Sequence, residues 1–349
     1  MWVDMDYIVI FQFFFRKLKK SINSTAKIFN ESYKIKYIEN KKVRQVLVEC
    51  NDEIVTHELG ESYYFYSNVL MKYIFFFSDG YHTPYSSLKF YFKKPIFSVR
   101  KVNYPIVYAS NSVPGHYGHF IVYVAPVILF QLSKIKSYGK VYIYIGEIEP
   151  KQFHEIFFNS LNIDYEFIRG PVTSSKIIYF QRFKSGSVDN DFVQVNSREI
   201  TRSFINFCKN HLSDRSFFPD KIFITRGNVK WRKLINEDEV KSLLIKHGYT
   251  CFEMDGLTIN QQISLFGNAK KIIGVHGGAM SNIIFSKSSK ILELFPYGYS
   301  KEKTTLLYST ISDNTYERLH GEEYDLSTEE CYRNILVSLD SLESILESF

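Results

Sequence analysis

The chain has 349 residues, of which 45% are hydrophobic and 17% aromatic, so it can bury the core of one large domain or of two ordinary ones. Its net charge of +6 and its pI of about 8.8 are milder than the basic balance typical of a nucleic-acid-binding domain. The cysteines form no metal-binding or disulfide pattern, which favours reduced thiols in a cytoplasmic protein: Cys50, Cys208, Cys251 and Cys331.

Residues 1–33 contain a short apolar run followed by basic residues. The run at 7–15 is shorter than the roughly twenty residues that a transmembrane helix needs, and no signal-peptide cleavage site follows it. The basic residues at 16–20 suit an anionic lipid surface. Two alternatives remain open: a peripheral anchor on the inner face of the membrane, or a segment packed on the body of the protein.

Residues 34–195 are expected to form an N-terminal α/β domain. Short alternating runs over 34–100, separated by turn residues such as Asp79 and Gly80, predict strands and loops. Strands then alternate with helices, which indicates a parallel sheet. The strands are expected at 106–110, 141–145 and 165–168, and the helices at about 119–134, with a kink at Pro126, and at 150–161.

The alternation becomes more regular after residue 196. It predicts a doubly wound domain at 196–326 and a C-terminal helix within 327–349. Helices are expected at 197–212, 236–247, 258–268, 278–286, 303–309 and 328–346, and strands at 222–225, 250–254, 271–275, 291–294 and 315–319. Two facing Rossmann-like domains would place a ligand cleft between the carboxyl edges of their sheets.

The most informative segment is 271–285. Its apolar strand ends in Gly274-Val275-His276-Gly277-Gly278, and a helix-like segment follows. The N–H groups and the dipole of such a helix start form a site for an anion such as a diphosphate, and the glycines let the ligand approach the backbone. The spacing is not that of GxGxxG, and no Walker A motif occurs, which argues against NAD enzymes and P-loop kinases.

Polar side chains are predicted around this turn. Arg226 ends a strand and Arg232 follows in the loop, where two guanidinium groups can clamp a diphosphate. His276 can bond a diphosphate or a sugar hydroxyl, and Glu293 can accept from ribose hydroxyls. Asn282 can contact the ligand or tie down the turn. Each residue also has a structural alternative, such as a surface ion pair or a helix cap.

This region resembles the family 61 glycosyltransferases over residues 222–296. The matching elements, in chain order, are Thr225-Arg226, Arg232, Asn236-Glu237, His276-Gly277-Gly278-Ala279, Asn282 and Glu293-Leu294-Phe295-Pro296. The resemblance implies a GT-B fold, an inverting transfer from a nucleotide-activated sugar and, as in bacterial members, a place in capsule or surface-polysaccharide assembly. It implies donor binding by Arg226, Arg232, His276, Gly277, Gly278, Ala279, Asn282 and Glu293, with the acceptor on the N-terminal domain.

The segment at 116–120 is similar to the family's aromatic-rich helix start, and Pro126 stands at the place of the family's proline. Two positions depart from the pattern: Tyr123 replaces an acidic residue, and Val127 replaces an arginine. If that acid contributes to catalysis in relatives, this chain needs another base. His119, and then His116, are the candidates, because a neutral imidazole can accept the proton of an acceptor hydroxyl.

No metal or cofactor is expected. Asp189-Asn190-Asp191 has the DxD form of a metal–diphosphate motif, but it lies in a polar connector. Arg226, Arg232 and the helix start would stabilise the leaving diphosphate instead. The expected partners are a nucleoside diphosphate sugar as co-substrate and a saccharide or lipid-linked acceptor, without nucleic acid.

Two other functions remain open. A nucleotide-sugar epimerase can share two facing α/β domains, but it needs carboxylates near the sugar, and the sequence identifies none. A catalytically degenerate partner in a polysaccharide assembly complex would account for Tyr123 and Val127. The preferred prediction is an inverting, metal-independent, cytoplasmic glycosyltransferase.

Overall fold

The computed structural model describes residues 99–110, 114–180, 198–214, 216–227, 229–299 and 304–349. Outside these ranges it gives the backbone of several strands: β1 (Lys36–Asn40), β2 (Gln45–Glu49), β3 (Thr56–Leu59), β4 (Tyr63–Tyr66), β5 (Val69–Lys72), β6 (Phe75–Phe77), β13 (Gly186–Val188) and β14 (Asp191–Val193). The predicted N-terminal segment at 1–33, and Asp189 and Asn190 of the DxD sequence, lie outside the described residues. No helix in the described ranges is long and apolar enough to cross a membrane.

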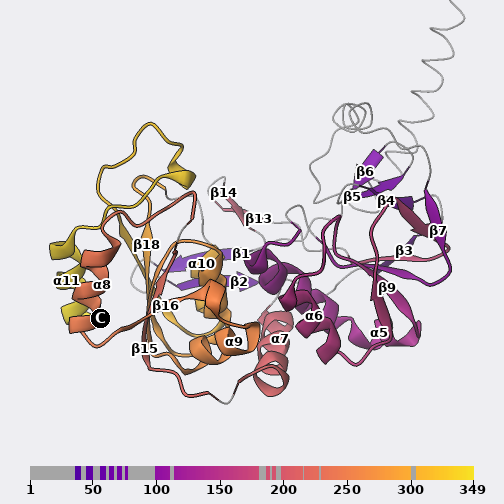
Figure 1. The fold of residues 1–349 in the computed structure, drawn as a ribbon, viewed down its shortest axis with the longest axis horizontal. Coiled ribbons are helices and arrows are strands. Elements are labelled where there is room, and N and C mark those ends of the chain that lie inside the picture. The colour runs from indigo at the N-terminus through magenta and orange to yellow at the C-terminus, as the bar shows by residue number, and fades with distance from the viewer. Residues whose placement is uncertain are drawn as a thin grey trace, which may run out of the picture.

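Five parallel strands form the sheet of the C-terminal lobe, which we define as residues 221–349 (Figure 1). Their order is β16-β15-β17-β18-β19. The chain goes from β15 outward to β16 and then returns to β17 on the other side of β15, so the strand order reverses between β15 and β17. Ligands of open α/β sheets bind beyond the carboxyl ends of the strands at such a reversal. The strands are β15 (Lys221–Thr225), β16 (Thr250–Glu253), β17 (Lys271–Val275), β18 (Lys290–Phe295) and β19 (Thr315–His320).

Helices cover both faces of this sheet, which is why β17 and β18 are almost entirely buried. On one face, α8 (Glu237–Lys246) packs against α11 (Leu339–Ser348) over a separate apolar cluster. On the other lie α9 (Ile259–Asn268), the 3₁₀ helix η3 (Gly278–Phe285) and α10 (Thr304–Ile311). These elements confirm the predicted alternation, although the segment after the glycine turn is 3₁₀ rather than α-helical.

The N-terminal lobe, defined as residues 56–180, has a second mixed sheet with the order β10-β9-β8-β12-β3. Its first four strands are mutually parallel, and β3 is antiparallel. A further sheet, β6-β5-β4-β11-β7, lies in the same lobe (Figure 1). The strands not yet given are β7 (Arg100–Val102), β8 (Ile106–Tyr108), β9 (Val141–Tyr144), β10 (Tyr165–Phe167), β11 (Val172–Ser174) and β12 (Ile177–Phe180), and α6 (Gln152–Ser160) connects β9 to β10. The mixed α/β fold with parallel sheets is consistent with the Rossmann-like architecture that the sequence predicts.

The helical segment after β8 bends as the sequence predicts. It consists of α3 (Tyr117–His119), the π-helical η1 (Phe120–Val124), α4 (Ala125–Phe130) and α5 (Leu132–Ser137). Pro126 has no N–H to donate to the Val122 carbonyl, and the regular α-helical bonding is interrupted just before it. The Val122 carbonyl accepts a 3.0 Å hydrogen bond from the hydroxyl of Tyr308 in α10. The bend therefore supplies a polar contact between the lobes.

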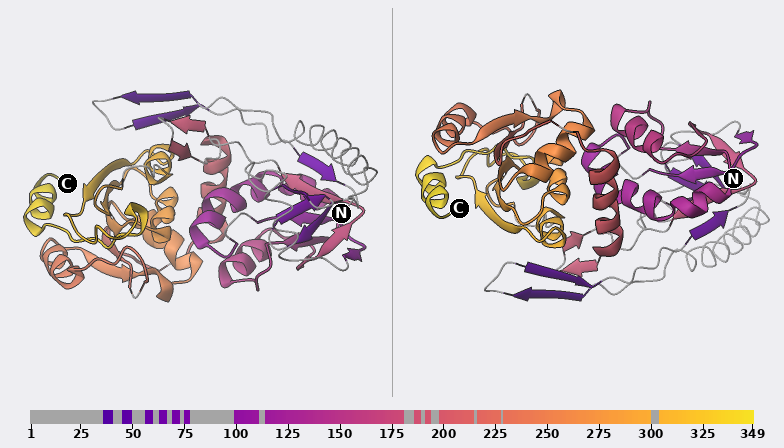
Figure 2. Two further views of the ribbon diagram at one scale, coloured as in Figure 1. Left: turned by 90° about the horizontal axis from the view of Figure 1, so that it is seen from above. Right: turned by 90° about the horizontal axis from the view of Figure 1, so that it is seen from below.

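The two lobes share one apolar core. Helix α7 (Arg198–His211) packs against α4 on one side and against α9 and η3 on the other. Figure 2 shows α7 between the elements of the N-terminal lobe and those of the C-terminal lobe. The cluster of buried side chains around it includes Val107 of the N-terminal sheet and Ile272 of the C-terminal sheet. This packing fixes how the two lobes face each other at the site.

The prediction of a helix over 328–346 is wrong in its first half. Only η4 (Glu330–Tyr332), a 3₁₀ turn, and α11, which is capped by Ser338, are helical. Between them, Ile335 forms a parallel bridge with Leu234, and its N–H donates to the Lys233 carbonyl at 2.7 Å. The alternate residues Ile335 and Val337 are buried, so this stretch has the two-residue period of an extended strand.

Asn236 opens α8 as predicted, but its side chain does not cap the helix. It donates to the Val337 carbonyl at 2.8 Å and accepts from the Val337 N–H at 3.1 Å. The loop between β15 and α8 is thus joined along its length to residues 332–337, at the carboxyl edge of the sheet.

Candidate active site

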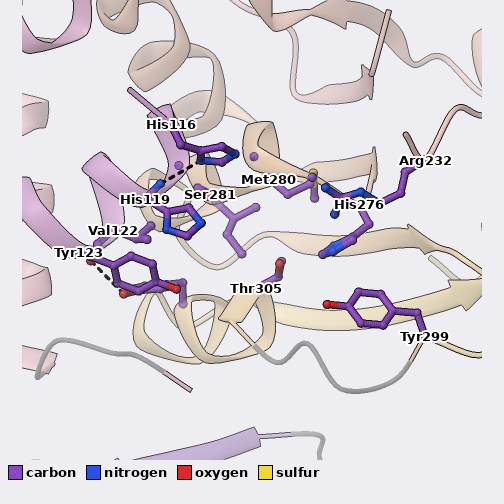
Figure 3. Close-up of a pocket in the computed structure, with 15 residues that line it drawn as sticks. His116, His119, Val122, Tyr123, Arg232, His276, Met280, Ser281, Tyr299 and Thr305 are labelled. Carbon is purple, nitrogen blue, oxygen red and sulfur yellow. Dashed lines mark hydrogen bonds between the residues drawn. The ribbon is translucent and has the colours of Figure 1, made fainter. Parts of the chain in front are cut away.

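A pocket of about 180 Å³ lies between the glycine turn after β17 and the start of α3 (Figure 3). It brings the predicted catalytic histidines of one lobe together with predicted donor-binding residues of the other. Its N-terminal wall consists of His116, Gly118, His119, Val122 and Tyr123, and its C-terminal wall of Arg232, His276, Gly277, Gly278, Met280, Ser281, Ile283, Tyr299, Thr305 and Tyr308.

The glycines of the turn make room for side chains from both lobes. A Cβ on Gly277 would lie 1.5 Å from Nη1 of Arg226, and a Cβ on Gly278 would lie 2.9 Å from Cε1 of His116. Neither distance is compatible with a side chain at the glycine, so the guanidinium and the imidazole can reach the turn only because both positions lack a Cβ.

Arg226 is anchored at the reversal point of the sheet. Its Nη1 donates to the His276 carbonyl at 2.8 Å, which links the end of β15 to the end of β17. Burial, together with the positive charge of Arg232, lowers the pKa of Arg226 to about 10. The guanidinium is still positively charged at neutral pH.

The two arginines carry positive charge without a carboxylate partner. No ion pair found among the described residues involves Arg226 or Arg232. The Nε atoms of both side chains are buried and make no hydrogen bond. Buried polar groups in folded proteins are nearly always bonded, and buried charges are nearly always paired. Arg226 and Arg232 are only partly buried as whole residues, so their combination makes this end of the pocket a candidate anion site.

Arg232 also has an uncommon backbone. Its φ is +59°, in the left-handed region that residues other than glycine seldom adopt. The N–H of Arg232 donates to the Tyr332 carbonyl at 3.3 Å, which helps to hold this conformation. Backbone strain of this kind costs on the order of 1–3 kcal/mol and clusters at ligand-binding sites.

His276 lies at the end of β17 and is held by a buried carboxylate. Its Nδ1 lies 2.8 Å from Oε1 of Glu293, a residue with no exposed surface. The imidazole stacks on Phe295, with ring centroids 4.1 Å apart. Thr305 and Tyr316 also donate to the Glu293 carboxylate. The ring of His276 is therefore fixed in both position and plane.

The Tyr316 hydroxyl completes this network. Burial and the negative charge of Glu293 raise the pKa of Tyr316 well above its usual value, so the phenol stays protonated and can donate to Glu293. It accepts in turn from Nε of Arg318 at 2.7 Å. The network balances the buried carboxylate with neutral and cationic donors.

The hydrogen bonds assign different roles to two histidines of the pocket. Because Glu293 can only accept, Nδ1 of His276 carries the proton and Nε2 is an acceptor when the ring is neutral. Nδ1 of His116 accepts from the backbone N–H of His119 at 3.4 Å, so neutral His116 carries its proton on Nε2. Desolvation, and then the charges of Arg232, Lys151 and Arg226, lower the pKa of His116. His116 is therefore a neutral donor at pH 7.

Three predicted donor-binding residues stand behind the pocket wall. Asn282 is fully buried, donates to Gln262 at 2.9 Å and to the Ala279 carbonyl at 3.1 Å, and accepts from the Tyr117 hydroxyl. It ties the turn to α9 and to the other lobe. Ala279 packs on the core, and the carboxylate of Glu293 is occupied by protein donors. In this conformation none of the three lines the pocket, and Arg226, whose guanidinium is bonded to the His276 carbonyl, does not line it either.

Several lining residues carry no signal in the sequence. Tyr299 follows β18 and Tyr308 lies in α10, and both reach the pocket only through tertiary packing. Tyr123, at the position where the resemblance led us to expect an acid, also lines the pocket, and its ring centroid lies 5.4 Å from that of His119. A helical spacing of four residues brings these two side chains to one face. That spacing, together with the family resemblance, is the sequence signal that places Tyr123 in the site.

An α/β fold with an anion site at the reversal of a parallel sheet is typical of enzymes that act on nucleotides. The model of the Glycosyltransferase 61 family matches residues 117–292, about half of the chain. The protein belongs to this family and is a glycosyltransferase. The family implies, in general terms, a nucleotide-sugar donor and a glycan acceptor. No curated protein was found to match the chain.

Replacement of Gly277 by alanine tests the position of Arg226. The new Cβ would overlap Nη1 of Arg226, so the guanidinium must leave the turn. We expect Gly277→Ala to lower nucleoside diphosphate affinity about tenfold or more, because a hydrogen bond to a charged group contributes about 1.5–3 kcal/mol. Isothermal titration calorimetry measures this loss.

Gly256→Ala is the matched control, because a Cβ there meets nothing within 4 Å. It is expected to leave the affinity unchanged. Equal affinities of the Gly277 and Gly256 variants for nucleoside diphosphate would show that binding does not require Arg226 at its observed position beside the turn.

Proposed function

We propose that this protein is an inverting, metal-independent glycosyltransferase of GT-B type. It transfers a sugar from a nucleoside diphosphate sugar to a saccharide or lipid-linked acceptor in surface-polysaccharide assembly. One observation supports the proposal most: Arg226 and Arg232, which form no ion pair with a described residue, lie near each other at the reversal point of the sheet. They lie beside a pocket whose opposite wall carries the histidines of the other lobe.

A diphosphate fits the charges of this end of the site. Arg226 and Arg232 supply two cations, and Gly277 and Gly278 allow close approach to the backbone. Neutral His116 can add a donor from the opposite wall. Two guanidinium groups can also stabilise the charge that builds up on a departing diphosphate.

The pocket has two chemically distinct ends. Figure 3 shows His119 and Tyr123 at one end, and Arg232, His276 and Tyr299 together at the other. A donor with its diphosphate at the arginines would direct its sugar toward His119. The acceptor would then approach along the N-terminal lobe, which supports the GT-B assignment of donor and acceptor to opposite lobes.

The proposed reaction is a single displacement at the anomeric carbon. The acceptor oxygen forms a bond to this carbon from one side while the bond to the diphosphate oxygen breaks on the other, which inverts the configuration. A base takes the proton of the acceptor hydroxyl, and the diphosphate leaves with its electron pair. His119 is the preferred base, because it lies at the acceptor end and Nδ1 of His116 is already occupied.

The epimerase alternative receives less support from the pocket. Among the described residues that line it, none is Asp or Glu, whereas the epimerase hypothesis requires carboxylates near the sugar. The degenerate-partner alternative rests on Tyr123 and Val127 and predicts binding without turnover. Activity measurements distinguish it from the proposal.

Arg226→Ala is the main test of the donor site. It removes a cation and its charge-assisted bonds, so nucleoside diphosphate affinity should fall about 10- to 150-fold. Calorimetry with a panel of nucleoside diphosphates measures the change. Arg202→Ala is the matched control, because Arg202 forms an exposed ion pair with Asp313 away from the pocket. The donor assignment fails if the two variants, both folded, bind nucleotide equally well.

His119→Ala tests the assignment of the base. We expect turnover to fall about 10²- to 10⁴-fold, with little change in donor affinity. A base must be unprotonated, so the wild-type rate should decline as the pH falls through the imidazole pKa, near 6.5 when unperturbed. If His116 were the base, the decline would come at lower pH, because its surroundings lower its pKa. Near-normal turnover of the variant would exclude His119 from the mechanism.

Metal independence is a separate expectation. The two arginines can neutralise a diphosphate by themselves, so transfer should persist in excess EDTA. The measurement is the initial rate with and without the chelator, at equal ionic strength. A complete loss of activity that manganese restores would contradict the proposal. Asp189 and Asp191 would then be the candidate metal ligands.

A further inference from the structure

An exposed aromatic pair stands beside the arginine end of the pocket. Trp231 is 42% exposed and Tyr332 is 43% exposed. Their ring centroids lie 5.3 Å apart at an interplanar angle of 42°. Aromatic side chains contribute most to stability when they are buried, so a paired and exposed Trp and Tyr indicate a surface that is kept for contact with a ligand.

The backbone around this pair is closely constrained. The Arg232 N–H donates to the carbonyl of Tyr332, and Ile335 exchanges hydrogen bonds with residues 233 and 235. The side chain of Asn334 accepts from the Lys233 N–H at 2.9 Å. These bonds join the loop after β15 to the segment after β19, so the two rings are held by a paired backbone rather than by a free loop.

The pair is continuous with the donor site. Trp231 directly precedes Arg232, which lines the pocket, and adjacent Cα atoms are only about 3.8 Å apart. Nη1 of Arg333, next to Tyr332, donates to the Tyr297 carbonyl at 3.1 Å. Tyr297 is two residues before Tyr299. Tyr299 lines the pocket at the same end as Arg232 (Figure 3).

The covalent structure of a nucleotide sugar predicts which part of the donor lies beside Trp231 and Tyr332. Its diphosphate connects the sugar to the nucleoside, so a sugar at the histidine end places the nucleoside beyond the arginines. A nucleobase is a flat aromatic group, and bases stack on exposed aromatic side chains in a way that tolerates different bases. Nζ of Lys230 lies 4.6 Å from the Trp231 ring centroid and adds positive charge to this edge.

We infer that Trp231 and Tyr332 form the platform on which the base of the donor nucleotide stacks. The inference rests on the proposed function and extends it by assigning the nucleoside subsite. An acceptor glycan could also stack on aromatic rings, but it would have to enter at the end of the pocket opposite to His119. The experiment separates these two ligands.

Calorimetry with the full chain compares UDP, CDP, GDP and ADP with inorganic pyrophosphate, which has no base. For Trp231→Ala and Tyr332→Ala, we expect affinity for the best-bound nucleotide to fall about 5- to 150-fold, equivalent to about 1–3 kcal/mol at 1.4 kcal/mol per tenfold. Pyrophosphate affinity should stay within twofold of wild type. Trp231→Phe should retain most of the nucleotide affinity, because phenylalanine can also stack.

Phe217→Ala serves as the control for removal of an exposed ring. Phe217 is 91% exposed and lies in the loop before β15, at the amino edge of the sheet. We expect this variant to bind nucleotide and pyrophosphate like the wild type.

Fluorescence gives a second readout. The chain has two tryptophans, Trp2 and Trp231, so Trp2→Phe leaves Trp231 as the sole indole. The best-bound nucleotide should change its emission with the affinity that calorimetry gives, whereas pyrophosphate should change it little.

Four outcomes would overturn the inference. If the Trp231 and Tyr332 alanine variants bind nucleotides like the wild type, or lose nucleotide and pyrophosphate affinity equally, the platform is excluded while the proposed function stands. If they keep nucleotide affinity and only the KM for acceptor rises, the rings bind the glycan. If none of the nucleotides binds the wild type, the proposed function fails and the platform fails with it.

Discussion

The hydrogen bond from Arg226 to the His276 carbonyl is the interaction on which the site depends. It joins the ends of β15 and β17 at the reversal of the sheet, and it requires that Gly277 have no side chain. Because Arg232 lies nearby and no carboxylate in the described part of the chain pairs with either guanidinium, the site holds two like charges in a partly desolvated place. Burial lowers the pKa of Arg226 only to about 10, so the charge persists at neutral pH. An anionic ligand would relieve both the repulsion and the unmet hydrogen bonds.

Hydrogen bonds also fix the side chains behind the pocket, around Glu293. Glu293 has no exposed surface, and its donors include His276 and Tyr316. A buried carboxylate is unfavourable unless it is paired and hydrogen-bonded, and here both conditions are met. The carboxylate acts on the site through His276, whose tautomer and ring plane it fixes. In this conformation Glu293 holds His276 in place, and the ribose contact that the sequence suggested for Glu293 stays a prediction.

The contacts between the lobes explain how His116 and His119 reach residues of the other sheet. Pro126 leaves the Val122 carbonyl without its helical donor, and Tyr308 of the other lobe bonds to it. The hydroxyl of Tyr117 bonds to Asn282 beneath the glycine turn at 2.5 Å. Two positions on which the family resemblance drew, Pro126 and Asn282, thus contribute to the contacts that join the lobes.

The sequence by itself predicted the strands and helices at residues 106–168 and 198–320, the glycine turn and its arginines, and the family, but it missed β11, β12, β13 and β14 between those ranges. The strands and helices follow from the local periodicity of apolar residues. The glycine turn and its arginines follow from residue types that a turn or an anion site needs at a given position. The sequence could not show that 333–337 is extended, because only pairing with residues 233–236 overrides its helical pattern. Nor could it show that Glu293 faces inward, or that Tyr299 and Tyr308 line the pocket. Those facts depend on contacts between residues far apart in the chain, and only the tertiary structure decides which side of a strand or helix meets another element.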